Sequence, residues 1–277
     1  MKTGINLGLC SNLVSPQDII PMVADVGFDA CFWDAVPGGQ PTMAQIARRI
    51  REHNLIFQSV HAPFGEVDKL WPAGARGDRE LASLIDWTRQ CADQQVPIMI
   101  CHVWIGFGEP KPNNIGIDRF GQLLLEAEKL GVKIAFENTE GEAYLQAVRD
   151  QLWSSPTAGF CIDTGHEMCY NHSRDLFGEY GANGKLIATH LNDNLGITGN
   201  EITWLDASHL FPFDGVADWK GIACRLKQAG YRDILTFELT NRNKPDRSTH
   251  DRYAHLSAED MLKLAHSKAL QFAAMMD

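Results

Sequence analysis

The sequence lacks any hydrophobic run that approaches the length of a membrane span. The apolar stretch near the N-terminus, residues 5–14, is interrupted by Asn6, Ser11 and Asn12, and it is too short and too polar for a secretory signal. A Ser/Gly linker, a low-complexity tract and a break in composition are also missing. We therefore expect one domain over residues 1–277, with no membrane partner.

Cysteine patterns typical of disulfides or metal sites are absent as well. The seven cysteines are an odd number, and no pair shows the spacing of metal ligands. Cys31, Cys101 and Cys161 lie within apolar, strand-like runs, where a buried free thiol is expected. Free thiols are typical of a reducing compartment, so we expect a cytoplasmic protein.

Positive charge is scarce. The chain has 25 Lys and Arg against 35 Asp and Glu, which gives a formal net charge of −10. Its one basic run, residues 48–51, is typical of the solvated face of a helix. Proteins that hold a nucleic-acid backbone gain most of their non-specific affinity by neutralising phosphates with Lys and Arg. The composition therefore argues against a nucleic-acid partner.

What the sequence does contain is a recurring unit in which a helix ends at a glycine and a short apolar strand follows. Gly27, Gly131 and Gly230 stand at such joins, where glycine accepts the left-handed conformation that closes a helix. The helices before these joins carry apolar residues at a spacing of 3.6. Ser15 and Pro16 are typical of a helix start, as a capping hydroxyl and a proline in the first turn.

Eight apolar segments are predicted to be strands. They are residues 4–9, 28–33, 56–61, 97–102, 132–137, 159–163, 186–190 and 234–238. Continuous apolar runs are typical of parallel strands that helices cover on both faces. Eight strands that alternate with helices form either an open doubly wound sheet or a closed (β/α)8 barrel, and 277 residues fit one such barrel.

Six of these segments end on a side chain that can bind a metal. The six are His61, His102, Glu137, Asp163, His190 and Glu238. In a barrel the carboxyl ends of all strands meet at one rim, whereas an open sheet would space them roughly 5 Å apart per strand. One polar residue at a strand end is commonly structural, but six in phase are hard to explain in that way. Three carboxylates brought together repel unless a cation lies among them. We therefore predict an α/β fold, a single-domain (β/α)8 TIM barrel, with a divalent metal at that rim.

Several segments, in this order and spacing, resemble the xylose-isomerase-like barrel superfamily over nearly the whole chain. They are Ser59-Val60-His61-Ala62-Pro63-Phe64, Ala135-Phe136-Glu137-Asn138, Ile162-Asp163-Thr164-Gly165-His166, His190-Leu191-Asn192-Asp193, His209-Leu210-Phe211-Pro212-Phe213-Asp214-Gly215 with Asp218-Trp219, and Phe237-Glu238. That superfamily includes sugar isomerases, ketose 3-epimerases, hydroxypyruvate-type isomerases, 3-dehydroshikimate dehydratases and a zinc endonuclease for abasic DNA.

The resemblance implies four metal ligands: Glu137, Asp163, His190 and Glu238. Carboxylate oxygens and one imidazole suit Mn²⁺ first, with Mg²⁺, Co²⁺ or Zn²⁺ as alternatives. Glu137 and Glu238 would also be the two acid/base groups of a metal-dependent isomerase or epimerase. They would move a proton next to the polarised carbonyl of a small carbohydrate, by way of an enediolate. A homo-oligomer is a further expectation from the family.

Five other residues are expected to bind substrate: Trp33, His61, His102, His166 and His209. For His166 the alternative is support of Asp163, and for Trp33 it is ordinary core packing. His61 and His102 could instead bind a second metal together with Glu137, as the endonuclease resemblance implies.

Two other activities remain open. A lyase, of the dehydratase or deglycosidase type, would share the first proton abstraction and then expel a leaving group. The nuclease would draw its third metal site partly from Asp206 and His209. The chain departs from the nuclease pattern in residues 206–209 and 213–215, and its acidic charge also argues against this reading.

The segment from 241 to 255 carries four basic residues. They are Arg242, Lys244, Arg247 and Arg252. Loops after the seventh and eighth strands of a barrel often hold a phosphate, so a phosphorylated substrate is one hypothesis for this loop. A solvated loop or a subunit contact is the other.

Overall fold

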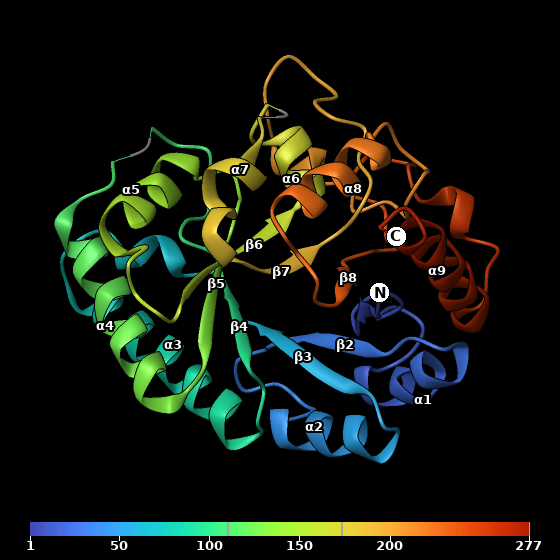
Figure 1. Cartoon of the computed structure of the whole chain (residues 1–277), viewed down its shortest axis with the longest axis horizontal. Coiled ribbons are helices and arrows are strands. Elements are labelled where there is room, and N and C mark those ends of the chain that lie inside the picture. The colour runs from blue at the N-terminus through green and yellow to red at the C-terminus, as the bar shows by residue number, and fades with distance from the viewer. Residues whose placement is uncertain (110, 173, 277) are drawn as a thin grey trace.

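The computed structural model describes residues 1–109, 111–172 and 174–276. Over these residues eight strands form one parallel sheet in the order β7-β6-β5-β4-β3-β2-β1-β8, and helices surround it (Figure 1). The two ends of this order also meet. The Leu191 N–H donates to the Thr236 carbonyl at 2.8 Å, and the Glu238 N–H donates to the Leu191 carbonyl at 3.2 Å. This short join closes the sheet, and the prediction of a (β/α)8 barrel is confirmed.

All eight predicted strands are found, with ends that differ from the prediction by up to three residues. The strands are β1 Thr3–Asn6, β2 Ala30–Asp34, β3 Ile56–His61, β4 Ile98–Cys101, β5 Lys133–Glu137, β6 Ala158–Asp163, β7 Leu186–His190 and β8 Leu235–Phe237. The α-helices are α1 Pro16–Val26, α2 Met43–Glu52, α3 Ala75–Asp93, α4 Asn114–Leu130, α5 Glu142–Leu152, α6 Thr164–Cys169, α7 Leu176–Tyr180, α8 Trp219–Gln228 and α9 Ala258–Ala273. Single 3-10 turns are η1 Val67–Leu70, η2 Ala182–Gly184, η3 Trp204–Asp206 and η4 Asp251–Tyr253.

The helix ends follow the local sequence. The Ser15 hydroxyl accepts a hydrogen bond from the Asp18 N–H at 3.3 Å, and Pro16 is the first residue of α1. Helices α1 and α4 end at Gly27 and Gly131, with φ of 107° and 68°. Glycine adopts this left-handed region readily, so a strand can start at once.

The main core lies between the strands and the helices that surround them. On α4 the buried face includes Phe120, Leu123 and Ala127, and the Phe120 ring meets the edge of Phe136 from β5 at 5.7 Å. Cys31, Cys101 and Cys161 are buried free thiols, as the apolar runs predicted. None of the helices in the described ranges is long and apolar enough to cross a membrane.

Candidate metal centre

The pleat of the strands explains why the polar residues share one rim. Side chains two residues apart on a strand point to the same face. Inside the barrel, one small apolar layer consists of Ile98, Ile100, Ala135, Cys161 and Ala188, with Ile187 packed against it. On each of β4, β5, β6 and β7, a polar residue follows two positions after the last residue of this layer. These polar residues are His102, Glu137, Asp163 and His190. The same spacing places these polar side chains above the apolar layer, at the carboxyl ends of the strands.

Four side chains meet at the centre of this rim. Glu137, Asp163, His190 and Glu238 each offer one ligand atom, and these atoms all lie within 4.8 Å of one another. His190 Nδ1 is 3.2 Å from Glu137 Oε2 and 3.2 Å from Glu238 Oε2. Ligands about 2.1 Å from an octahedral ion stand roughly 4.2 Å apart across it, so the spacing suits a single divalent cation.

The polar atoms of this group support the same interpretation. Both carboxylate oxygens of Glu137, both ring nitrogens of His190 and Oε2 of Glu238 are buried and have no hydrogen-bond partner among the described residues. Buried polar atoms are normally hydrogen-bonded, because leaving them unpaired costs free energy. Unpaired carboxylate oxygens and imidazole nitrogens that face one another fit a metal ion.

The charges of the group are strongly coupled. Burial raises the pKa of Asp163 to about 7. Burial also opposes ionisation of Glu137, but His190, followed by His102 and His166, lowers the pKa of Glu137 well below its usual value. For His166 burial opposes protonation, yet Asp163 and Glu137 raise its pKa to about 9. The buried carboxylates therefore favour a positive charge close to them, and a bound cation can supply this charge.

Neighbouring residues fix the orientation of Asp163 and His190. Asp163 Oδ2 accepts a hydrogen bond from Asn192 Nδ2 at 2.9 Å, and Asp163 Oδ1 accepts one from the His166 N–H at 2.7 Å. The ring of His190 stacks on Phe32, with centroids 4.5 Å apart. Such contacts hold ligands in place before an ion binds.

Three of the predicted substrate-binding histidines surround Glu137. His61 Nε2 and His102 Nε2 lie 3.3 Å and 3.6 Å from Glu137 Oε2, and 3.2 Å from each other. His166 Nδ1 lies 3.3 Å from Glu137 Oε1 and 3.0 Å from the carbonyl of Asn138. His166 thus contacts Glu137, while its backbone supports Asp163.

The other two residues predicted to bind substrate, His209 and Trp33, lie further from Glu137. His209 Nδ1 is 3.6 Å from Glu238 Oε2, and burial lowers the pKa of His209 to about 4. Trp33 is buried in the core, where its ring meets the edge of Trp87, yet it also lines the cavity at the barrel mouth. Trp33 therefore packs in the core and also lines the cavity, so its position is compatible with both expectations.

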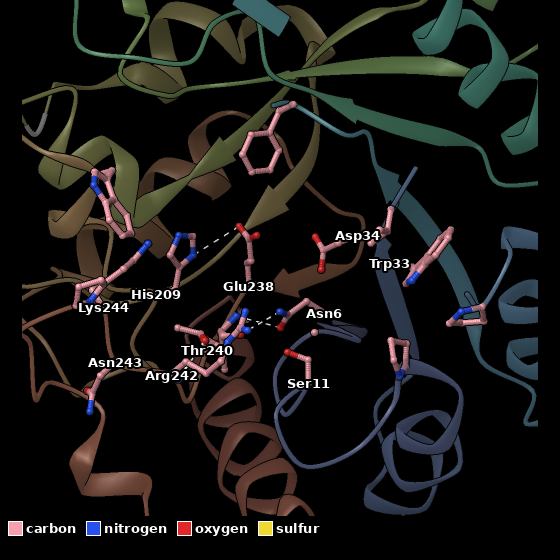
Figure 2. Close-up of a pocket in the computed structure, with 18 of the residues that line it drawn as sticks. Asn6, Ser11, Trp33, Asp34, His209, Glu238, Thr240, Arg242, Asn243 and Lys244 are labelled. Atoms are coloured by element: carbon pink, nitrogen blue, oxygen red, sulfur yellow. Dashed lines mark hydrogen bonds and ion pairs between the residues drawn. The ribbon is translucent and has the colours of Figure 1, made fainter. Parts of the chain in front are cut away.

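The cavity above the centre has two connected parts. An inner part of about 370 Å³ is lined by His61, His102, Glu137, His166 and Glu238, among others. An outer part of about 700 Å³ opens towards β1, β2 and the loop after β8 (Figure 2). The two parts share Phe64, Trp204, His209, Glu238 and Lys244. Both volumes suit a small-molecule ligand.

Two polar strand ends were not predicted from the sequence. Asp34 is the last residue of β2 and lines the outer cavity, where burial raises its pKa to about 6. The signal was present, because Asp34 follows directly after an apolar run. Asn6 ends β1, and its side-chain amide exchanges two hydrogen bonds of 3.0 Å with the backbone of Leu239. All eight strands therefore end at or next to a polar residue on this rim.

Asp206, which the endonuclease pattern would use as a ligand, is occupied elsewhere. Its Oδ1 accepts hydrogen bonds from the N–H and hydroxyl of Thr198, at 3.1 Å and 2.5 Å, and its Oδ2 accepts one from the Thr203 N–H at 2.8 Å. Both oxygens thus hold the loop after β7.

The model of the xylose isomerase-like TIM barrel family matches residues 20–261, and the chain belongs to this family. The uncharacterized protein y4fM of Sinorhizobium fredii (strain NBRC 101917 / NGR234) is 28% identical over 293 residues, which cover 92% of this chain and 88% of that protein. Two solved structures share the fold. One is D-psicose 3-epimerase in the presence of D-fructose, with a TM-score of 0.74 and 16% identity over 100% of this chain and 99% of that chain. The other is the IolI protein with a binding zinc atom, with a TM-score of 0.78 and 16% identity over 100% of this chain and 99% of that chain.

Proposed function

We propose that this protein is a divalent-metal-dependent sugar isomerase or epimerase that transfers a proton next to the carbonyl of a small keto-sugar. The observation that carries the proposal is the group of Glu137, Asp163, His190 and Glu238, whose ligand atoms lie within 4.8 Å of one another beside a cavity. The family and the fold shared with a 3-epimerase support the choice of a sugar as substrate.

These four residues would hold the ion, with Mn²⁺ as the first choice and Mg²⁺, Co²⁺ or Zn²⁺ as alternatives. When bound, the ion would supply Lewis acidity at the carbonyl and the neighbouring hydroxyl. The donor set contains no thiolate, which distinguishes it from a structural zinc site.

Glu137 and Glu238 are the proposed acid/base pair. Both line the inner cavity, and they approach it from the ends of β5 and β8. Although burial opposes ionisation, nearby histidines, His190 first, lower the pKa of both carboxyl groups, which keeps both carboxylates ionised. One carboxylate removes the proton from the carbon next to the carbonyl, and the other returns a proton on the opposite face or at the neighbouring carbon. Groups of this kind contribute about 10²–10⁴-fold each.

The remaining residues of the inner cavity would position the sugar. His61, His102 and His166 present ring nitrogens near Glu137, where they can bind substrate hydroxyls. His209 borders Glu238, and Trp33 closes the side of the outer cavity.

The test is incubation of metal-loaded protein with candidate ketoses in D₂O, followed by mass spectrometry and NMR of the recovered sugar. We expect deuterium at the carbon next to the carbonyl, and protein stripped of metal by a chelator is the control. Loss of a leaving group from the sugar would identify a lyase instead. A metal-loaded protein that neither exchanges nor eliminates with any ketose would refute the proposal.

A zinc-dependent abasic-site endonuclease is the second candidate, because two further groups of side chains can hold an ion. They are His61, Glu137 and His190, and Asp163, His166 and His209. The occupied oxygens of Asp206 and the net charge of −10 argue against it. Metal analysis separates the two, because we expect about one ion per chain for the epimerase, and two or three zinc ions with cleavage of abasic DNA for the nuclease.

A further inference from the structure

The loop after β8 places two basic side chains at the cavity. Lys244 lines both the inner and the outer part, and Arg242 lines the outer part. In the view of Figure 2, Lys244, His209 and Glu238 follow one another across the cavity, with Asp34 on the far side. The mouth therefore has a basic side that faces the carboxylates of the proposed metal centre.

Lys244 has no carboxylate within ion-pair distance in the part of the chain that the structure describes. Its ammonium instead lies over the ring of Trp204, 4.9 Å from the centroid. Two other cations of the C-terminal part of the chain are engaged, since Arg252 donates to the carbonyl of Asp214 at 2.8 Å and Lys268 pairs with the Asp214 carboxylate at 2.7 Å. Lys244 is thus available to a ligand.

The surroundings of Lys244 make an uncharged ligand a poor match. Lys244 is half-buried, and burial lowers its pKa although Glu238 opposes this effect. Withdrawing a charge from water costs free energy unless an opposite charge compensates it. Sugar hydroxyls can be bound by neutral groups, whereas a phosphate or carboxylate would supply the missing charge.

We propose that Lys244, assisted by Arg242, binds an anionic group on the end of the substrate remote from the metal, so that the substrate is an acidic ketose. The anion can be a terminal phosphate or a terminal carboxylate, since both offer the same oxygen acceptors. In barrels of this kind the loops after strands 7 and 8 often bind phosphate, and Lys244 lies in the second of these loops. The chemistry of the substrate rests on the proposed function, whereas anion binding by Lys244 can be measured without turnover.

Two purely structural roles for Lys244 lead to different results. The ammonium could hold the loop by its contact with Trp204, or it could moderate the charge of Glu238. Loss of either structural role would change the Kd of neutral and acidic ketoses by a similar factor and would leave the preference for acidic ketoses in place. A change in the preference between them is therefore the decisive readout.

The experiment uses three ketoses that differ only at carbon 6: D-fructose, D-fructose 6-phosphate and D-fructuronate. Calorimetry on the metal-loaded protein measures the Kd of each, and deuterium exchange gives kcat and KM where there is turnover. We expect at least one acidic ketose to bind about 10- to 100-fold more tightly than fructose, as charged hydrogen bonds typically provide. Lys244→Met should remove this preference and Lys244→Arg should retain part of it, while Lys220→Met, at an exposed position on α8, serves as the matched control.

Each result decides something. The tighter of the two acidic ketoses identifies phosphate or carboxylate as the anion. Equal binding of all three, no measurable binding of either acidic ketose, or a preference that survives in Lys244→Met would overturn the inference. Deuterium exchange of neutral ketoses together with any of these would leave the proposed function standing. If acidic ketoses bind in a way that depends on Lys244 but no ketose undergoes exchange or elimination, the proposed function is wrong and the anion site is supported.

Discussion

Glu137 has the most ionisable neighbours in the centre. Its Oε2 lies within 3.6 Å of a ring nitrogen of His61, His102 and His190, and its Oε1 lies 3.3 Å from His166 Nδ1. Among the described residues, the histidines within ion-pair distance of Glu238 are His190 and His209. A substitution of Glu137 would therefore disturb the whole group, whereas a substitution of Glu238 tests one carboxylate with less disturbance.

Glu238→Gln should nearly abolish turnover. The amide keeps the size of the side chain but can neither accept the substrate proton nor supply the negative charge for the ion. We expect a loss of about 10²–10⁴-fold in kcat, measured by deuterium exchange into a substrate ketose. Glu259→Gln, at an exposed position of α9 where the residue pairs with Lys263, is the matched control. Activity like that of the unchanged protein, at full metal occupancy, would remove Glu238 from the mechanism.

The polar strand ends of the candidate metal centre could be predicted because their positions follow from chain geometry, whereas the choice of four of them as ligands came from the resemblance to the xylose-isomerase-like superfamily. Alternation along a strand and convergence of the strand ends are properties of any barrel, so His61, Glu137, Asp163 and His190 needed only correct strand ends. Asp34 was missed because the predicted strand stopped one residue early. The free ammonium of Lys244 could not be predicted, since it depends on which carboxylates the fold places nearby.

At the scale of elements, the sequence predicted the strands better than the segments between them. The apolar run after β1 continues through residues 7–10, but there the chain turns, and the Ser11 N–H donates to the Gly8 carbonyl at 3.1 Å. Leu7, Leu9 and Cys10 are nonetheless buried, so burial alone could not distinguish strand from turn. The long segment after β7 has no periodicity, and side-chain bonds such as those of Asp206 shape it.

Helix α9 offers a test of one element. The Ser257 hydroxyl accepts a hydrogen bond from the Asp260 N–H at 3.1 Å and so caps the first turn. Since α9 packs against α1, β1 and β8, we expect Ser257→Ala to lower the free energy of unfolding by about 1 kcal/mol in urea. Ser267→Ala, at an exposed position within α9, replaces the same side chain without a cap and should not destabilise. Equal effects of the two variants would show that the cap is unimportant.

At the scale of the whole molecule, the reactivity of the thiols tests whether the native packing protects the buried cysteines from solvent. All seven cysteines are described; six are buried and Cys224 is exposed. Burial raises the pKa of Cys10 to about 11 and that of Cys91 to about 12, which leaves little reactive thiolate. Native protein should therefore take up one iodoacetamide per chain by mass spectrometry, Cys224→Ser should take up none, and urea should expose all seven. Rapid labelling of a second thiol in native protein would contradict this packing.

The join between β7 and β8 would give a bound metal ion a structural effect on the whole barrel. This seam depends on few backbone bonds, among them those of the Leu191 and Glu238 N–H groups, and β8 has only three residues. His190 and Glu238 stand on opposite sides of the seam, so one ion bound to both would clamp it. An ion present at 100 times its Kd stabilises the native state by about 2.7 kcal/mol. We expect Mn²⁺ to raise Tm and to slow hydrogen exchange of the Leu191 and Glu238 amides more than that of the Ala35 amide, which joins β2 to β3. A uniform change at all three amides would mean that the ion stabilises the fold without closing this seam, and no change in Tm would argue against binding at the four ligands.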